Sequence, residues 1–265
     1  MEQSFAWWCF ANRGVEAEAL LAGAARIGYT GVDLIDEGWW PLARKHGLRV
    51  AAVTGHGTLT DGLNRHENAP RIEAELRANI AKARAAEIPV LICFSGNRAP
   101  DLDNEAGLAA AAETLARCAL IAEAEGVTLA VELLNSRVDH RDYMADRTEW
   151  GVRLCERVGS PAVRLLYDIY HMQIMEGDLI RSIGAHQRHF AHYHTAGNPG
   201  RGEFIGGAAG AAAGGDEQEI NYPAVFRAIR RTGFTGFVAH EFIPAGDPLA
   251  ALARAYALTE ASLAR

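Results

Sequence analysis

The sequence predicts an α/β fold of the (β/α)8 (TIM) barrel type, formed by a single domain over residues 1–265. Eight short β-rich runs alternate with longer helical patterns along the chain, and strict alternation indicates parallel strands joined by right-handed crossovers. Each strand–helix pair has about 33 residues, close to the share expected in a barrel of roughly 250 residues. A doubly wound open sheet usually carries a G-x-G-x-x-G turn after its first strand, and no such motif follows the first run here.

The predicted strands are short runs of aliphatic, β-branched and aromatic residues. In chain order they cover residues 5–10, 31–35, 50–55, 90–95, 128–133, 163–168, 190–194 and 237–242. Helices between and after them are predicted, among other places, at residues 70–86, 105–125, 146–158, 223–232 and 248–263. The helix at 70–86 starts with Pro70, where a missing amide hydrogen costs nothing. The segments between the predicted strands are thus long enough for the crossover connections of a parallel barrel.

The composition excludes several classes of function. The chain has 33 acidic and 26 basic residues, a net charge of −7 without runs of like charge, which argues against binding to nucleic acid or a membrane surface. It shows no secretory start and no apolar stretch of membrane-spanning length, so we expect a cytoplasmic protein. The two lysines, Lys45 and Lys82, fall where helix ends and exposed helix faces are expected, which disfavours Schiff-base chemistry.

Four polar residues stand at the ends of four consecutive predicted strands, the fifth to the eighth. They are Glu132, Asp168, His194 and Glu241. The carboxyl ends of barrel strands meet at one face, so we expect these side chains to converge there. Carboxylates gathered in one place repel one another unless a positive charge lies among them. Carboxylate oxygens with one imidazole suit Mn²⁺, Mg²⁺ or Co²⁺, and the sequence therefore predicts a divalent metal site.

Four further residues near these strand ends are candidates for substrate binding. Arg201 offers a fixed, two-pronged cation that suits a substrate carboxylate, or it is a solvated loop residue. His171, three residues after Asp168, either hydrogen-bonds a substrate oxygen or orients a metal ligand. Asn135 either contacts substrate or caps its loop. The glycines beside His56 allow a ligand to approach the backbone, although a structural role for this histidine is equally open.

A run of glycine and alanine at residues 205–215 interrupts the pattern after the seventh strand. It contains no charge and, after Ile205, no large side chain, so it cannot form a core of its own. We expect a flexible loop insertion. Two roles remain open for it, a passive insertion or a lid over the face on which barrel enzymes perform chemistry.

Short motifs spread over most of the chain resemble those of the xylose-isomerase-like TIM barrels. Within that group they are similar to the hydroxypyruvate isomerase family and the related ketose 3-epimerases. The motifs are GHGT at 55–58, VELLN at 131–135, YDIYH at 167–171, AHYHTAG at 191–197 and EINYP at 219–223, together with Glu241.

The resemblance implies a metal held by Glu132, Asp168, His194 and Glu241, with the two glutamates also acting as the acid/base pair. It implies an isomerase that interconverts hydroxypyruvate and tartronate semialdehyde by proton transfer through an enediolate. Arg201 would bind the substrate carboxylate. A homo-oligomer, dimer or tetramer, is implied as well.

One residue departs from a branch of the resembling family. Bacterial hydroxypyruvate isomerases tend to carry glutamine where His194 stands, whereas the epimerases carry histidine. An alternative function is therefore a ketose 3-epimerase or a keto-acid sugar isomerase with the same metal ligands. Two other classes are disfavoured. A metal-dependent DNA-repair endonuclease of this barrel type would need a basic groove and further histidines, and a silent sugar-binding barrel would not need both glutamates.

Overall fold

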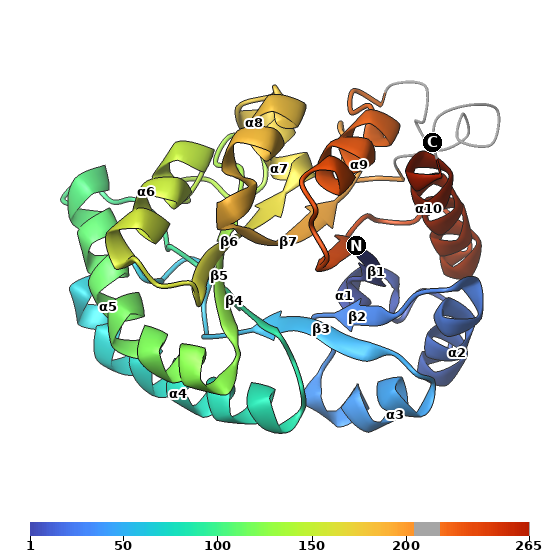
Figure 1. Cartoon of the computed structure of the whole chain (residues 1–265), viewed down its shortest axis with the longest axis horizontal. Coiled ribbons are helices and arrows are strands. Elements are labelled where there is room, and N and C mark those ends of the chain that lie inside the picture. The colour runs from blue at the N-terminus through green and yellow to red at the C-terminus, as the bar shows by residue number, and fades with distance from the viewer. Residues whose placement is uncertain (204–217, 265) are drawn as a thin grey trace. The chain divides into compact units, whose positions relative to one another are not determined.

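The computed structural model describes residues 1–203 and 218–264, in which parallel strands alternate with helices (Figure 1). The strands are β1 (Glu2–Phe5), β2 (Gly31–Asp33), β3 (Arg49–Thr54), β4 (Val90–Cys93), β5 (Thr128–Leu133), β6 (Val163–Asp168), β7 (Phe190–Thr195) and β8 (Phe237–His240). The helices are α1 (Trp7–Phe10), α2 (Ala17–Ile27), α3 (Trp40–Lys45), α4 (Ala69–Ala85), α5 (Asn104–Glu125), α6 (Thr148–Val158), α7 (Ile169–Met175), α8 (Leu179–His186), α9 (Tyr222–Arg231) and α10 (Pro248–Leu263). Three 3-10 turns, η1 (Glu37–Trp39), η2 (His66–Asn68) and η3 (Gln187–His189), complete the described elements.

The hydrogen-bonded strand order is β1-β8-β7-β6-β5-β4-β3-β2. Each strand therefore lies beside its neighbours in the sequence. A parallel bridge between Ala6, which directly follows β1, and Asp33 of β2 joins the two ends of this order. A cyclic order of eight parallel strands with intervening helices is the topology of a (β/α)8 barrel, and the predicted fold class is confirmed.

The chain divides into two compact units. The first comprises Met1–Ala51, Asp178–Gln187 and Tyr193–Arg265, and the second comprises Ala52–Gly177 and Arg188–His192.

In the first unit, α10 packs against both α2 and α9. Gly23 on α2 allows this close approach, because a Cβ atom there would lie 2.5 Å from the Leu249 side chain of α10. Strand β8 pairs with β1 and with β7, and Thr195 stands opposite His240. The amide of Glu241, one residue past β8, donates to the Thr195 carbonyl at 2.8 Å. This register fixes Glu241 at the carboxyl end of the strand pair.

In the second unit, α5 packs against α4, which precedes it, and against α6, which follows it, around the outside of β4, β5 and β6. Gly151 brings α6 close to the sheet, since a Cβ atom there would lie 2.8 Å from the Leu165 side chain. On β5, Glu132 stands opposite Leu166 of β6, two residues before Asp168. Both acids therefore lie at the carboxyl ends of adjacent strands.

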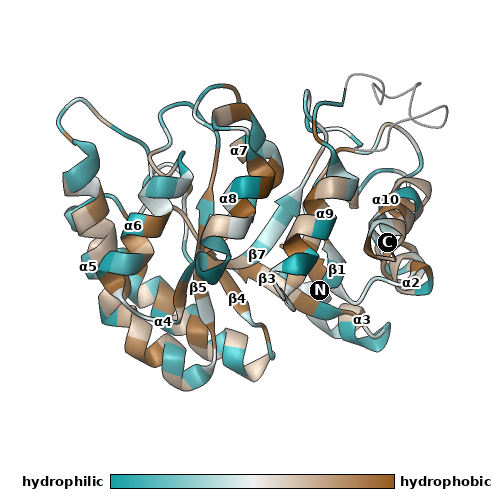
Figure 2. Cartoon of the chain, turned by 45° about the horizontal axis from the view of Figure 1, so that its top comes forward, coloured by the Kyte–Doolittle hydropathy of each residue, from teal (hydrophilic) through white to brown (hydrophobic). Residues whose placement is uncertain are grey.

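The strands differ in polarity along the chain. Strand β4 is wholly apolar, with the sequence VLIC, and all four of its residues are buried. Strand β7 carries two histidines, His192 and His194, and its arrow is coloured as hydrophilic in Figure 2. Buried polar side chains need partners, so a polar strand interior indicates a site rather than a packed core.

The predicted elements agree with the structure except at the amino terminus. Strands 128–133 and 163–168 and helix 248–263 are confirmed to the residue, and the others agree within a few residues. The strand predicted at 5–10 is wrong, because β1 spans Glu2–Phe5 and Trp7–Phe10 form a short helix. The prediction missed strand β1 because Gln3 is polar. It is buried and hydrogen-bonded to Glu260 and His240, so it belongs to the interior despite its polarity.

Two features complete the comparison with the sequence. Helices α7 and α8, between β6 and β7, were not predicted. The glycine- and alanine-rich run at 205–215 lies outside the described residues. Of the helices that are described, none has the length and apolar character needed to cross a membrane.

Candidate active site

The first unit places His194 and Glu241 side by side. His194, on β7, is fully buried and Glu241 is 3% exposed. The imidazole Nδ1 lies 3.0 Å from Oε2 of Glu241. The same carboxylate accepts hydrogen bonds from the Trp8 indole at 2.9 Å and from Arg201 at 2.6 Å. Glu241 is thus contacted by side chains from three different segments of the unit.

Arg201 is held firmly against Glu241. Its backbone carbonyl accepts a hydrogen bond from the Ile243 amide at 2.8 Å, and its guanidinium lies 5.3 Å from the centre of the Trp8 ring. Its backbone adopts a φ of 55°, an uncommon conformation for a residue with a side chain. The contact of the guanidinium with the Trp8 ring is a cation–π interaction, which adds to the ion pair with Glu241 in fixing the Arg201 side chain.

These neighbours keep the Glu241 carboxylate ionised. Burial alone would raise its pKa, but the charges of His194 and Arg201 and the hydrogen bonds to the carboxylate hold the pKa well below the usual range of a glutamate. A buried carboxylate that stays charged at neutral pH is able to bind a cation or accept a proton.

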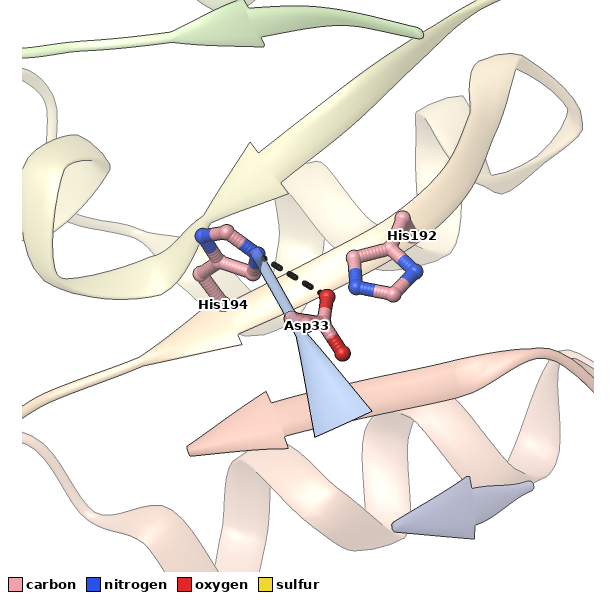
Figure 3. A group of neighbouring side chains, drawn as sticks. All are labelled: Asp33, His192 and His194. Atoms are coloured by element: carbon pink, nitrogen blue, oxygen red, sulfur yellow. Dashed lines mark ion pairs between the residues drawn. The ribbon is translucent and has the colours of Figure 1, made fainter. Parts of the chain in front are cut away.

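Asp33, at the end of β2, reaches the other side of the His194 ring. Its carboxylate Oδ2 lies 3.5 Å from Nε2 of His194, and the side chain is fully buried. Figure 3 shows this ion pair between the Asp33 carboxylate and the His194 ring. Each ring nitrogen of His194 therefore faces a carboxylate oxygen.

The second unit places Glu132 and Asp168 together. They are 6% and 1% exposed, respectively, and a carboxylate oxygen of one lies within 4.8 Å of an oxygen of the other. Two buried carboxylates at this distance repel each other, and the repulsion is relieved by a cation between them. The pair therefore fits a divalent metal ion, as the sequence predicts.

Hydrogen bonds position both acids of this second pair. The Tyr143 hydroxyl donates to the Glu132 carbonyl at 2.9 Å. Oδ1 of Asp168 accepts the backbone amide of His171 at 3.0 Å and so caps the start of α7. Nε2 of His171 lies 3.6 Å from Oδ2 of Asp168. His171 thus contacts the acid directly, as an orienting residue would.

Asn135 links His171 to the turn that follows β5. Its amide nitrogen lies 2.6 Å from Nδ1 of His171 and donates to Asp139 at 2.7 Å. Its side-chain oxygen accepts the amides of Val138 and Asp139, both at 2.9 Å. Asn135 therefore caps this turn, which is one of the two roles that the sequence leaves open for it.

Both ring nitrogens of His56 contact the backbone. Nε2 accepts the Phe94 amide at 3.0 Å, and Nδ1 lies 3.0 Å from the Gly57 carbonyl. Burial lowers the pKa of this histidine, more than the Gly57 carbonyl raises it. These contacts hold a neutral ring in place between two segments and favour the structural role over substrate binding.

The structure thus brings the predicted metal ligands together in pairs, one pair in each unit. Histidine nitrogen and carboxylate oxygen form a mixed donor set that suits Mn²⁺, Mg²⁺, Co²⁺ or Zn²⁺. Trp8 and Asp33 were missed by the sequence analysis. Asp33 ends β2, but it lies in the middle of the strand predicted at residues 31–35, so its place at a strand end was not evident from the sequence. No sequence pattern indicates that Trp8 reaches Glu241.

The fold and the relatives of this chain define a barrel enzyme of the isomerase type. The family model for the xylose isomerase-like TIM barrel matches residues 21–260, and the chain belongs to this family. It is 31% identical over 189 residues to a 2-oxo-tetronate isomerase of Cupriavidus necator, a match that covers 69% of this chain and 67% of that protein. It is 30% identical over 179 residues to the hydroxypyruvate isomerase of Escherichia coli, covering 66% and 65%.

Solved structures share the fold at lower identity. An AP endonuclease of family 2 from Brucella melitensis superposes with a TM-score of 0.78 at 24% identity, over 95% of this chain and 97% of that one. An L-ribulose 3-epimerase superposes with a TM-score of 0.79 at 19% identity, over 100% and 95%. These likenesses support the barrel fold.

Proposed function

We propose that this protein is a metal-dependent isomerase that interconverts hydroxypyruvate and tartronate semialdehyde. The observation that carries the proposal is the presence of two buried ligand pairs, Glu132 with Asp168 and His194 with Glu241, at the ends of consecutive strands. In the proposed site these four side chains hold one divalent ion. The isomerase names of two relatives support the reaction type.

The two glutamates are the proposed acid and base. One removes the proton from the hydroxyl-bearing terminal carbon of hydroxypyruvate, and an enediolate results. The other glutamate, or the same one, returns a proton to the adjacent carbon, while a proton moves from one oxygen to the other. A bound divalent ion supplies positive charge beside these oxygens and makes proton loss from carbon easier.

Arg201 and His171 are the proposed substrate-binding residues. Arg201 carries a fixed charge beside Glu241, so it is well placed to bind the carboxylate of a small keto acid. His171 contacts Asp168 and would donate to a substrate oxygen. We leave His56 and Asn135 out of this role because their polar atoms are already engaged in structural contacts. We further propose a cytoplasmic homo-oligomer.

A second candidate function is the epimerisation or isomerisation of a longer ketose or keto-acid sugar at the same site. The histidine at position 194 favours it, because the resembling epimerases carry histidine there. A nuclease is disfavoured by the net charge of −7, since proteins that bind a phosphate backbone usually present a basic surface.

The test is to strip the protein of metal, add back Mn²⁺ or Mg²⁺, and follow hydroxypyruvate beside four- to six-carbon ketoses. We expect metal-dependent conversion of hydroxypyruvate to tartronate semialdehyde. Glu132→Gln and Glu241→Gln should each lower kcat at least about a hundredfold, the loss expected of an acid/base group. Glu203→Gln is the matched control, since Glu203 is a buried acid paired with Arg254. Metal-dependent turnover of a ketose alone would select the second candidate, and retention of more than about a tenth of activity would remove a glutamate from its role.

A further inference from the structure

Asp33 is a buried acid that the proposed reaction does not use. It is fully buried at the end of β2. Burying a carboxylate costs several kcal/mol unless a partner offsets the loss of water. The Oδ2 atom of Asp33 lies 3.5 Å from Nε2 of His194, within ion-pair distance. This contact points to a role that involves the histidine.

The two nitrogens of His194 have different neighbours. Nδ1 faces Glu241 at 3.0 Å, and Nε2 faces Asp33. A neutral histidine that binds a metal through one nitrogen carries its proton on the other, and that proton needs an acceptor. Because Glu241 is itself a proposed ligand, the ion belongs on the Nδ1 side. The proton then belongs on Nε2, towards Asp33.

We infer that Asp33 is a positioning residue that accepts the Nε2 proton of His194 and so presents Nδ1 to the metal (Figure 3). This inference rests on the proposed function, because it takes His194 as a metal ligand. Carboxylates in this position fix the orientation of the ring and make the ligating nitrogen a better donor. Asp33 is held for this task by the bridge between its strand and Ala6.

The first test measures Mn²⁺ affinity by calorimetry on the metal-stripped full chain. Asp33→Asn keeps the size of the side chain and removes its charge, and we expect the dissociation constant to rise about 10- to 100-fold. Glu203→Gln, which removes another buried acid of the same unit, should bind Mn²⁺ as the wild type does. Unchanged affinity in Asp33→Asn would overturn the inference. A wild-type chain that binds no metal would instead contradict the proposed function.

The second test measures the wild-type protein and uses one variant only to assign its signals. Nitrogen-15 NMR of histidine-labelled wild-type protein reports which ring nitrogen of His194 carries the proton, with assignment by comparison with a His194→Gln sample. We expect Nε2 to carry a proton in the metal-free protein, in which Nδ1 also donates to Glu241, and to keep it when diamagnetic Mg²⁺ or Zn²⁺ is added and Nδ1 is bare. A bare Nε2 in either state would contradict the role of Asp33.

Discussion

Tyr143 connects the carboxyl ends of β4 and β5, and its hydroxyl is a sensitive point of the second unit. The side chain is fully buried. Its hydroxyl accepts the Ser95 amide and donates to the Glu132 carbonyl, both at 2.9 Å. Burial raises the pKa of this tyrosine well above its usual range, so the hydroxyl stays neutral and able to donate.

Tyr143→Phe keeps the ring and removes both hydrogen bonds. A buried backbone group left without its partner costs about 1–3 kcal/mol, and two such groups with partial relaxation give a loss of about 3 kcal/mol. For a chain of this size that corresponds to a fall in Tm of about 6–12 °C. Urea unfolding followed by near-UV circular dichroism measures the free energy of unfolding directly.

Tyr170→Phe is the matched control. Tyr170 is also buried, but its hydroxyl makes one described hydrogen bond, to the Asp139 carboxylate at 2.8 Å. The Asp139 side chain is 30% exposed, so water replaces the lost donor and the expected cost is about 1 kcal/mol. A loss of less than about 1 kcal/mol in Tyr143→Phe, or equal losses in the two variants, would refute this reasoning.

Two further predictions concern Arg201 and His56. Arg201→Ala should raise the KM of carboxylate-bearing substrates far more than the KM of neutral ketoses. An equal rise in KM for both kinds of substrate would argue against carboxylate binding by Arg201. His56 has a lowered pKa in the folded chain, so its contribution to stability is present above the ordinary histidine pKa and is lost as the pH falls below it. The difference in unfolding free energy between wild type and His56→Gln should therefore be smaller at about pH 5 than at about pH 7.5, and a constant difference would contradict the assignment.

Much of the fold follows from the sequence because the strands of a barrel are buried on both sides. Apolar runs such as the one at β4 are then easy to recognise. The same rule fails for β1, where Gln3 is buried but satisfied by His240 and Glu260, residues more than 230 positions away. Sequence patterns do not reveal hydrogen bonds between such distant segments.

Some contacts of the candidate site could be predicted from the sequence and others could not. Glu132 and Asp168 were predicted from their places at strand ends, and the structure confirms that position for both. The contact of Trp8 with Glu241 depends on the short helix α1, where the sequence analysis predicted a strand. The pairing of Arg201 with Glu241 depends on a loop conformation in which Arg201 has a positive φ. An arginine in the sequence does not predict this conformation.

The most direct test of the account is the stoichiometry of Mn²⁺ binding to the metal-stripped chain. Electron paramagnetic resonance counts free Mn²⁺ during a titration, and we expect one tightly bound ion per chain. Asp168→Asn in the second unit and His194→Ala in the first should each abolish tight binding, because both pairs belong to one proposed site. No tight binding in the wild type, or full binding when either pair is altered, would contradict the account.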